Sequence, residues 1–453
     1  MRKLWHIPAR FLLVFTTMVP IYLSYLWLYL RGKYFGSPPS DAAFRKAHTK
    51  NAARFYRTAV RMRGGLIKVG QIISTRVDLV PDEWLKAMAP LQDKVTPTSW
   101  RRIRPHLQRE LGGDPDAVFE SVTHEAVAAA SFGQVHRATL KDGRDVAVKV
   151  RYPDVEMKLQ CDLAAMRIAV PLFNRFVPKV PLSDIYKEIG RALSTELDYE
   201  QEALFTERIE ENMRPVQSVL VPRVVREHTS NGVICTEFFD GMKITDRAGI
   251  DAAGLEVHDI IQKVMRAYAT MFFVDGVFQS DPHPGNLLVR KGEDGSAEVC
   301  ILDFGQSKIL PKDFHEKLVR SAFAFMVRDI DGFSKSIVEL GILSERDAEL
   351  ARPLLKEFFE ELFELSPEEL KELDITGLKA QVLEFIDKME GVVIPQDIVL
   401  YGRAFSLLAG VVTQLAPDIN GFVLAGPIIM QALAQGTKPQ RPLADQNAAP
   451  AHA

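Results

Sequence analysis

The fold of this chain is decided by two short segments, Asp281-Pro-His-Pro-Gly-Asn286 and Asp303-Phe-Gly305. Each follows an apolar, strand-like run, and polar groups at the ends of buried strands are held rigidly. Kinase-like phosphoryl transfer needs such a set: one Asp faces the attacking nucleophile, while an Asn and a second Asp hold Mg²⁺ against the nucleotide phosphates. The Asp-Phe-Gly triplet alone would also fit an ordinary strand end and turn. Together with a lysine-bearing strand upstream, the spacing predicts a kinase-like fold with Asp281 as catalytic base and Asn286 and Asp303 as metal ligands.

The upstream lysine lies in the middle of a strand-like run, Val146-Ala-Val-Lys149-Val. This run is joined to the β-rich segment Ser131–Leu140 by Lys141-Asp-Gly-Arg144, and Asp-Gly between two such runs predicts a hairpin. Taken alone, Lys149 would fit the solvent face of a half-buried strand. Because a loop of small residues precedes it, Lys149 also matches the lysine that holds the α- and β-phosphates of a nucleotide.

The loop before the hairpin resembles a glycine-rich phosphate loop in which alanines replace glycines. Of the pattern G-x-G-x-x-G-x-V only Gly133 and Val135 remain, and Ala128 and Ala130 occupy the first two glycine positions. Glycine permits positive φ and close backbone approach to phosphates, so we expect this loop to be stiffer and to hold phosphates differently. The candidate nucleotide-binding residues are Ala128, Ala129, Ala130, Ser131, Gly133, Val135, Lys149 and Glu237.

An acidic helix is predicted over residues 183–213, and Glu202 is the best candidate on it to pair with Lys149. Asp198, four residues before Glu202, shares its face of the helix, whereas Glu196 points elsewhere. A surface helix with solvated carboxylates would explain any single one of these acids equally well.

The second strong feature is an uncharged run of twenty residues, Phe11–Leu30, bounded by Arg10 and Arg31. As a helix it would reach about 30 Å, the thickness of the hydrocarbon core, so we expect it to span a membrane. A helix lying in the membrane interface is the first alternative. A cleaved signal peptide is the second, and it is disfavoured because no small-residue cleavage site follows Leu30.

The charge of the chain is uneven, although its net value is only −3. Residues 41–76 carry nine Lys or Arg residues against one acid, Asp41. This excess favours an orientation in which the rest of the chain faces the cytoplasm or another ATP-containing compartment. It would also attract anionic lipid headgroups, although a solvated helix face would look the same. The small net charge does not indicate nucleic-acid binding, and we expect none.

The pattern as a whole predicts an α+β, two-lobed protein-kinase-like fold with an N-terminal helical extension and an N-terminal membrane helix. Two further strands are predicted as a pair over Val219–Val225 and Gly232–Phe239. The expected parts are a membrane anchor and linker at 1–40, a helical extension at 41–115, an N-lobe at 116–240, a helical C-lobe at 241–435 and a disordered tail at 436–453.

In combination these motifs resemble the UbiB/AarF family of atypical kinase-like proteins, which support ubiquinone and other isoprenoid-lipid metabolism. The resemblance covers roughly residues 45–430. It is carried by Lys68-x-Gly70-Gln71, Ala128–His136, Val146–Lys149, Glu196-x-Asp198 with Glu202, Asp281–Asn286 and Asp303–Gly305. It implies ATP or ADP and Mg²⁺ as cofactors, with Lys149 and Glu202 forming the ion pair that positions the nucleotide.

The resemblance also implies a regulatory role for Lys68, Gln71, Glu196 and Asp198. Lys68 and Gln71 would lie over the cleft where a protein kinase receives its peptide, with Lys68 near the two acids. In the family this arrangement is associated with exclusion of protein substrates and with ATPase-type turnover. The sequence agrees, because helical sequence at about 311–328 follows the Asp-Phe-Gly segment and no Ala-Pro-Glu appears.

The first functional hypothesis is therefore a membrane-anchored ATPase that acts on isoprenoid or quinone-like lipids. Its expected partners are membrane lipids and enzymes of lipid biosynthesis. A true phosphotransferase, on a small molecule or a protein, and a nucleotide-binding scaffold of a biosynthetic complex are the alternatives. One departure from the family pattern is Gln279-Ser280, which stands where the family usually has His-Ala.

Overall fold

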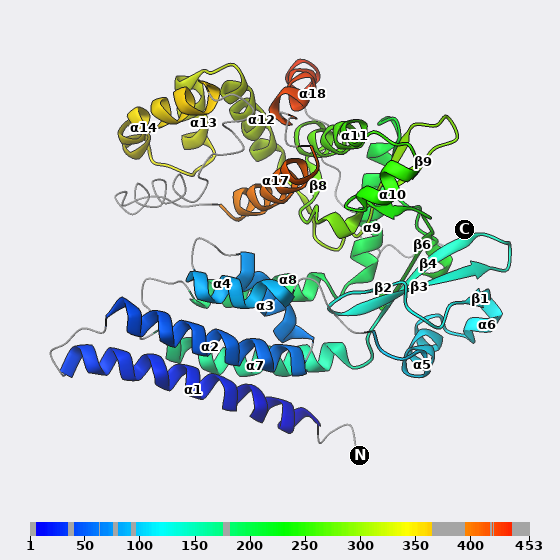
Figure 1. Ribbon diagram of the computed structural model, residues 1–453, viewed down its shortest axis with the longest axis horizontal. Helices are drawn as coiled ribbons and strands as arrows, with labels where there is room; N and C mark the ends of the chain where they lie inside the picture. Colours follow the sequence, from blue (N-terminus) through cyan, green and yellow to red (C-terminus); the bar gives the residue numbers. More distant parts are fainter. Residues whose placement is uncertain are drawn as a thin grey trace, which may run out of the picture. The chain divides into compact units, whose positions relative to one another are not determined.

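A computed structural model describes residues 6–34, 40–62, 64–75, 80–91, 97–174, 182–364, 395–416, 419 and 421–436 (Figure 1). All of the predicted linker Ser37–Ser40 except Ser40, and nearly all of the predicted disordered tail, lie outside these residues. The chain forms two compact units. Unit 1 comprises Met1–Glu200 and Val225–Glu237, and unit 2 comprises Gln201–Val224 and Phe238–Ala453.

Unit 1 contains an antiparallel sheet in the order β1-β3-β4-β6, with the short β2 paired to β3. The predicted hairpin is confirmed, because β3 and β4 pair along their length and Gly143 in the connecting turn has a φ of +85°. Side chains alternate between buried and half-buried along both strands. The strands are β1 (Phe119–Val122), β2 (Ala128–Ala129), β3 (Gly133–Leu140), β4 (Asp145–Arg151) and β6 (Val233–Glu237).

The two strands predicted over Val219–Val225 and Gly232–Phe239 are present in part, as β5 and β6, but they belong to different sheets. The first segment yields only β5 (Val219–Leu220), which pairs in parallel with β10 (Ala297–Ile301) in the sheet of unit 2. The second yields β6, which pairs with β4. Both segments are short and apolar. Which strand each one pairs with depends on packing between distant parts of the chain, so the order of strands along the sequence does not reveal it.

The predicted helix over 183–213 is likewise two helices, α8 (Leu182–Thr195) and α9 (Tyr199–Met213). The chain turns between them, and the amides of Leu197 and Asp198 bond back to the carbonyls of Ser194 and Thr195. The sequence does not predict this break, because no Gly or Pro lies at it and the helical periodicity continues across it.

The helical part of unit 1 is built around α1, which packs against α2 and α7. Val14, Ile21 and Leu28 recur every seven residues of α1 and are buried. The helices are α1 (His6–Tyr34), α2 (Asp41–Met62), α3 (Gly65–Thr75), α4 (Asp82–Met88) with the 3₁₀ turn η1 (Ala89–Leu91), α5 (Trp100–Glu110), α6 (Pro115–Val118), α7 (Val155–Asn174) and α8.

Polar contacts accompany the docking of α1. The Arg10 guanidinium bonds both oxygens of Asp162 on α7, at 2.8 and 2.6 Å, and donates to the carbonyl of Met62. The Asp162 side chain is fully buried, so this ion pair is shielded from water. Further along α1, Thr17 contacts Thr58 and the Tyr25 hydroxyl contacts His48, both on α2.

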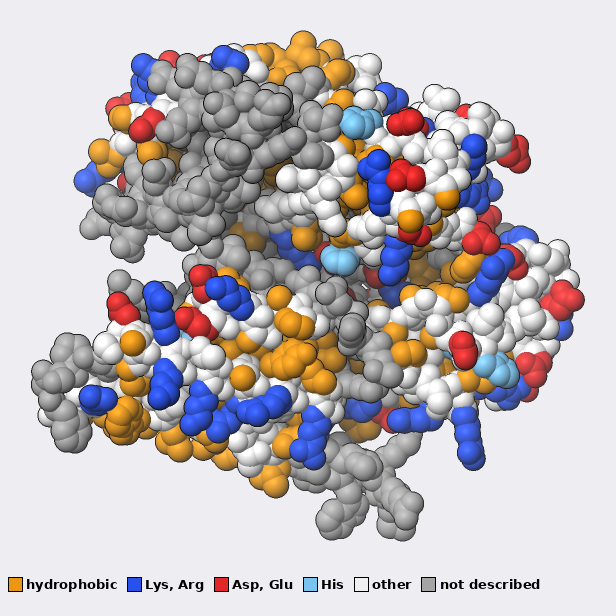
Figure 2. Space-filling view, in the orientation of Figure 1, with side chains coloured by type: hydrophobic (Ala, Val, Ile, Leu, Met, Phe, Trp, Pro, Cys, Tyr) orange, Lys and Arg blue, Asp and Glu red, His pale blue; other side chains and the backbone are white. Residues whose placement is uncertain are grey.

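The opposite face of α1 is apolar and exposed. Leu12, Phe15, Leu23 and Trp27 are each 45% exposed or more. Figure 2 shows hydrophobic side chains along the edge of unit 1 where Figure 1 places α1, with Lys and Arg side chains beside them. By length and composition alone, two described helices could cross a membrane, within Arg10–Tyr34 and Asp397–Leu415.

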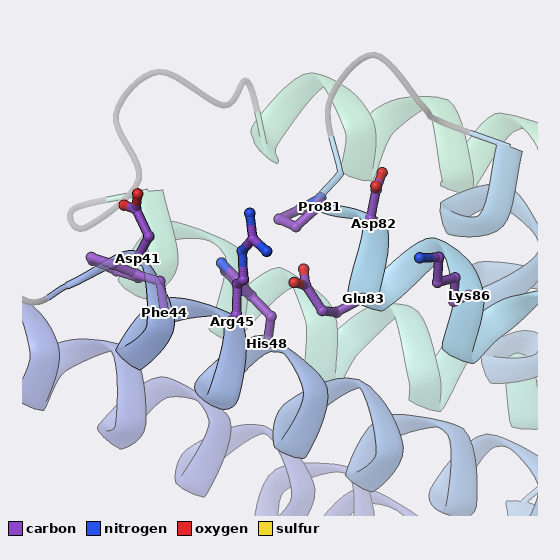
Figure 3. A pocket seen from close by; sticks show the side chains of 8 residues that line it. All are labelled: Asp41, Phe44, Arg45, His48, Pro81, Asp82, Glu83 and Lys86. Atoms are coloured by element: carbon purple, nitrogen blue, oxygen red, sulfur yellow. The ribbon is translucent and has the colours of Figure 1, made fainter. Parts of the chain in front are cut away.

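A polar hollow of about 410 Å³ opens between the first turns of α2 and α4 (Figure 3). Acidic and basic side chains line it together, including Asp41, Glu83, Arg45 and Lys86. Because the two signs of charge are mixed, the hollow favours neither an anion nor a cation.

Unit 2 contains a four-stranded sheet in the order β5-β10-β9-β7 and a separate pair, β8 with β11. Its strands are β7 (Met242–Lys243), β8 (Val277–Gln279), β9 (Leu287–Lys291), β10 and β11 (Ser307–Ile309), besides β5. Its helices include α10 (Arg247–Ala252), α11 (Val257–Ala269), α12 (Lys312–Met326), α13 (Ile330–Glu339), α14 (Glu345–Glu364), α17 (Gln396–Leu415) and α18 (Gly421–Gln435). The π-helical turn η3 (Thr270–Asp275) continues α11, and the 3₁₀ turn η4 (Pro284–Asn286) precedes β9.

Candidate functional site

The lysine predicted to hold phosphates lies on β4 of unit 1. Val148 and Val150 beside it are fully buried, whereas the half-buried Lys149 side chain takes the other face of the strand. Its Nζ lies 5.1 Å from the centre of the Tyr199 ring, within range of a cation–π contact. Lys149 is therefore supported by an aromatic face and is not a simple solvent-facing residue.

The alanine-rich loop is a tight structure beside that lysine. Ala128 and Ala129 pair with β3, and the amide of Ala130 donates to the carbonyl of Gly133 at 2.8 Å. A β-carbon at Gly133 would lie 2.4 Å from the Tyr199 hydroxyl oxygen and 2.6 Å from the Val150 carbonyl oxygen. The surviving glycine is thus required by close packing, and its φ is not positive.

Helix α3 brings the Lys-x-Gly-Gln motif against this loop within unit 1. Lys68, which is buried, forms an ion pair with Glu196. The amide of Gln71 donates to the carbonyl of Leu91 at 2.9 Å, and the Ser131 hydroxyl donates to the side-chain oxygen of Gln71 at 3.5 Å. A β-carbon at Gly70 would lie 2.3 Å from Leu91.

The turn between α8 and α9 is fixed by side chains from the sheet. Arg151 donates to the carbonyl of Leu197 at 2.6 Å and to the side chain of Asn231 at 2.9 Å. Asn231 in turn donates to Asp198 at 3.3 Å. Glu196 and Asp198 are therefore held on a short turn, and the helical face once predicted for Asp198 and Glu202 together does not exist.

The end of the loop motif, Gln134-Val-His136, has a structural role. His136 Nδ1 donates to the carbonyl of Thr123 at 2.7 Å, so its Nε2 accepts from the Gln134 amide at 2.8 Å. Gln134 also bonds both backbone groups of Thr98. Burial lowers the pKa of His136, which fits a neutral ring in this network.

Unit 2 brings together Asp281, Asn286 and Asp303, the predicted catalytic base and metal ligands. Asp281 follows β8, Asn286 precedes β9 and Asp303 follows β10. The antiparallel pair β9–β10 aligns Leu287 with Ile301, and the amide of Leu302 donates to the carbonyl of Asn286 at 2.8 Å. The Asn286 side chain donates to the carbonyl of Asp281 at 3.1 Å. All three residues therefore lie at one end of the β9–β10 hairpin.

Asp303 adopts a backbone conformation that L-residues rarely take, with a φ of +60°. The amide of Gly305 donates to its carboxylate at 3.2 Å. A β-carbon at Gly305 would lie 3.3 Å from the Glu202 carboxylate and 3.4 Å from that of Asp303. Backbone strain of this kind persists only where the surroundings impose it, and it clusters at functional sites.

The side chain of Gln279 holds the backbone of Asp303 in this conformation. It is fully buried, and its amide donates to the carbonyls of Leu302 and Asp303, at 2.6 and 2.8 Å. The Tyr268 hydroxyl donates to its side-chain oxygen. Burial, with the negative charge of Asp281, raises the pKa of Tyr268 well above its ordinary value, so the hydroxyl stays protonated. The departure from the family pattern at 279 is therefore a hydrogen-bonded support of Asp303.

Helix α17 reaches this end of the hairpin with two charged side chains. Arg403 lies 3.3 Å from the Asp281 carboxylate, and both side chains are partly exposed. Asp397, near the start of the helix, forms a 3.0 Å ion pair with Lys308 on β11. The sequence gives no local signal for this contact, because Arg403 and Asp281 lie more than a hundred residues apart along the chain.

The donor set at the hairpin end suits a hard cation. Mg²⁺ prefers oxygen ligands and is bound in kinase-like sites by one or two protein groups together with substrate phosphates. Asp303 and Asn286 offer a carboxylate and an amide oxygen. Among the described residues there is no group of three or more His, Cys, Asp or Glu that could hold a metal alone.

These features define a class of protein. Unit 1 carries a strand lysine beside a tight loop of small residues, and unit 2 carries the Asp–Asn–Asp arrangement at the end of a hairpin. The fold is kinase-like, with mixed helix and sheet. Residues 90–337 match the ABC1 atypical kinase-like domain, and the chain belongs to this family, as the UbiB/AarF resemblance predicted.

The relatives agree. The chain is 30% identical over 388 residues to an uncharacterised protein of Synechocystis sp., covering 83% of this chain and 66% of that protein. It is 30% identical to AarF domain-containing protein kinase 1 of Gallus gallus, covering 69% and 60%. It is 31% identical to the chloroplastic ACTIVITY OF BC1 COMPLEX KINASE 8 of Arabidopsis thaliana, covering 63% and 38%. The chain thus spans less than two thirds of their length.

Among solved structures, the complex of Rv3197 with erythromycin from Mycobacterium tuberculosis aligns with a TM-score of 0.52 at 22% identity. The alignment covers 83% of this chain and 98% of that one. This likeness supports the fold alone.

The nucleotide-binding roles of several residues are still predictions. Lys149 belongs to unit 1 and Glu202 to unit 2, and their pairing is an expectation. Glu237 is the exposed last residue of β6, opposite Val146. Sequence reasoning missed Tyr199 and Gln279, and only the unusual Gln at 279 gave a signal.

Proposed function

We propose that this chain is a membrane-associated, kinase-like ATPase that binds Mg-ATP and ADP and supports the biosynthesis of quinones or other isoprenoid lipids. One observation carries the proposal: Asp281, Asn286 and Asp303 lie together at the hairpin end, with Asp303 held at a φ of +60°. The lipid class comes from the family resemblance.

In the proposed reaction Asp303 and Asn286 would hold the cation, and Lys149, with Glu202 as its expected partner, would hold the α- and β-phosphates. Bound Mg²⁺ neutralises charge on the phosphates. Water attacks the γ-phosphorus, the bond to the ADP oxygen breaks, and Asp281 accepts the proton that the water loses. The product is ADP and inorganic phosphate.

Two observations favour ATPase turnover over transfer to a protein. The ion pair of Lys68 with Glu196 and the contact of Gln71 with Ser131 fix α3 against the alanine-rich loop. In addition, α12 begins at Lys312, soon after Gly305, and leaves no room for the segment with which protein kinases bind peptides.

The exposed face of α1 supports membrane association. It presents Leu12, Leu23 and Trp27, beside the basic α2. A helix that left unit 1 to span a bilayer would break the buried pair of Arg10 and Asp162, at a cost of about 3–5 kcal/mol. We therefore favour attachment along the membrane surface, with the docked face of α1 kept in place.

The test is phosphate release from Mg-ATP by the full chain, with and without anionic liposomes. Turnover should vanish in Asp303→Asn, and stimulation by liposomes should be lost in Trp27→Glu while basal turnover remains. Retained turnover in Asp303→Asn would refute the site. Equal stimulation of Trp27→Glu would refute the membrane role of α1.

Transfer to a small molecule is the second candidate, because the family resemblance assigns Asp281 the role of a base, and such a base could also accept the proton of a hydroxyl group. Phosphate release distinguishes the two. A phosphorylated lipid or metabolite formed at the rate of ATP loss, with little free phosphate, would favour the transferase.

A further inference from the structure

Unit 2 contains an apolar cavity of about 230 Å³ that the proposed reaction does not use. Its walls come from α11, η3, α12, α13, α17 and α18. Six aromatic rings line it: Phe272, Phe273, Phe325, Phe333, Tyr401 and Phe405. Among the described residues, every side chain that lines it is apolar apart from the hydroxyls of Ser321 and Tyr401.

The chemistry of the lining selects its ligand. A cavity needs several polar partners to hold ordered water, and apolar cavities of about 150 Å³ stay dry and bind benzene. The cavity in unit 2 is partly open to its surroundings, and its volume of about 230 Å³ has room for a neutral hydrocarbon of about nine or ten carbons. The described lining residues are all uncharged, so they offer an ion or a nucleotide no partner of opposite charge.

The cavity is linked to the candidate site by α17. Tyr401 and Phe405 on this helix face the cavity, and Arg403 between them contacts Asp281. The Tyr401 ring also packs edge-to-face on Phe272 at 4.8 Å and on Phe278 at 6.3 Å. Phe278 immediately precedes Gln279, so a ring that lines the cavity contacts the strand that supports Asp303.

We propose that this cavity binds a small neutral apolar molecule and that α17 couples its occupancy to the site at Asp281. Filling the cavity would press on Tyr401 and Phe405 and so change how α17 presents Arg403. By linkage, a ligand that alters nucleotide binding is itself bound differently when nucleotide is present. The coupling rests on the proposed nucleotide site, whereas binding in the cavity does not.

The experiment uses naphthalene as the probe and the full chain in detergent, with detergent alone as a blank. Binding is measured without nucleotide, and Mg-ADP affinity is measured separately with and without saturating naphthalene. Ala425→Phe, on the α18 wall, fills the cavity. Ala434→Phe places the same side chain on an exposed position of the same helix and is the matched control.

We expect naphthalene to bind the wild type and Ala434→Phe, and to bind Ala425→Phe about ten-fold more weakly or worse. Saturating naphthalene should change the Mg-ADP affinity of the wild type about five-fold or more. It should leave the Mg-ADP affinity of Arg403→Met unchanged. If Ala425→Phe does not fold, Ala322→Leu on the α12 wall provides the same comparison.

Equal binding to the two Phe variants would overturn the cavity assignment. Binding without any change in Mg-ADP affinity, in a wild type that binds Mg-ADP, would overturn the coupling. A wild type that binds naphthalene but no nucleotide would contradict the proposed function and leave the cavity intact, so the two failures are distinct.

Discussion

Replacing Gln279 with leucine should release the backbone at Asp303. The wild-type amide donates two hydrogen bonds, to the carbonyls of Leu302 and Asp303, and its oxygen accepts from Tyr268. Leucine has a similar volume and no polar group. The change therefore removes all three bonds while leaving the packing of the fully buried position nearly intact.

The expected loss follows from the groups left behind. Two carbonyl oxygens and one tyrosine hydroxyl each lose this one partner in a buried region, at about 1–2 kcal/mol for each group that finds no replacement. With partial relaxation we expect a total of about 2–4 kcal/mol. Asp303 would also lose the contacts that hold its φ at +60°, so its carboxylate should no longer be positioned for a cation.

The assay is thermal unfolding of the full chain, together with Mg-ADP affinity by calorimetry. At about 2–4 °C per kcal/mol the Gln279→Leu variant should melt several degrees lower, and it should bind Mg-ADP about ten-fold more weakly. Gln279→His, which restores a ring N–H donor, should recover part of both losses. A Gln279→Leu protein with wild-type melting and affinity would refute the reasoning.

Three further predictions concern unit 1. Gly133→Ala should lower the free energy of unfolding by about 2–4 kcal/mol, because its β-carbon would overlap the Tyr199 hydroxyl. Denaturant titration measures this loss. Adding Tyr199→Phe should relieve only part of it. Lys68→Ala should cost about 3–5 kcal/mol by leaving Glu196 without this partner, and the double variant with Glu196→Gln should cost less than the two single changes together. Between pH 7 and 5 the free energy of unfolding should fall, because burial holds the pKa of His136 below its ordinary 6.5 and only the unfolded chain then binds the proton. His136→Asn should flatten that slope, and an unchanged slope would contradict the assignment.

The parts of the fold with local signals were predicted from the sequence. Asp142-Gly143 indicated the β3–β4 hairpin, and the turn residue does adopt positive φ. The residues Asp281, Asn286 and Asp303 were placed at strand ends, and the pairing of β9 with β10 brings those ends together. In each case the sequence pattern and the structural partner lie close together along the chain.

The parts that depend on distant partners were not predicted. β5 pairs with a strand of unit 2, and no periodicity within Val219–Leu220 could identify it. The loop pattern singles out Gly133 without showing what it contacts, and the structure packs it closely on Tyr199. The sequence shows that Gln279 departs from the family pattern, but it does not reveal the hydrogen bonds that this side chain makes.

The interleaving of the two units bears on how the chain is made. The backbone passes between them after Glu200, Val224 and Glu237, so unit 1 is complete once Glu237 has left the ribosome. β5 ends at Leu220, and its partner β10 ends at Ile301, roughly 80 residues later. At about 5–20 residues per second, this apolar strand waits on the order of 4–16 s with an open edge. A fragment cut at the lobe boundary near residue 240 would carry that open edge permanently.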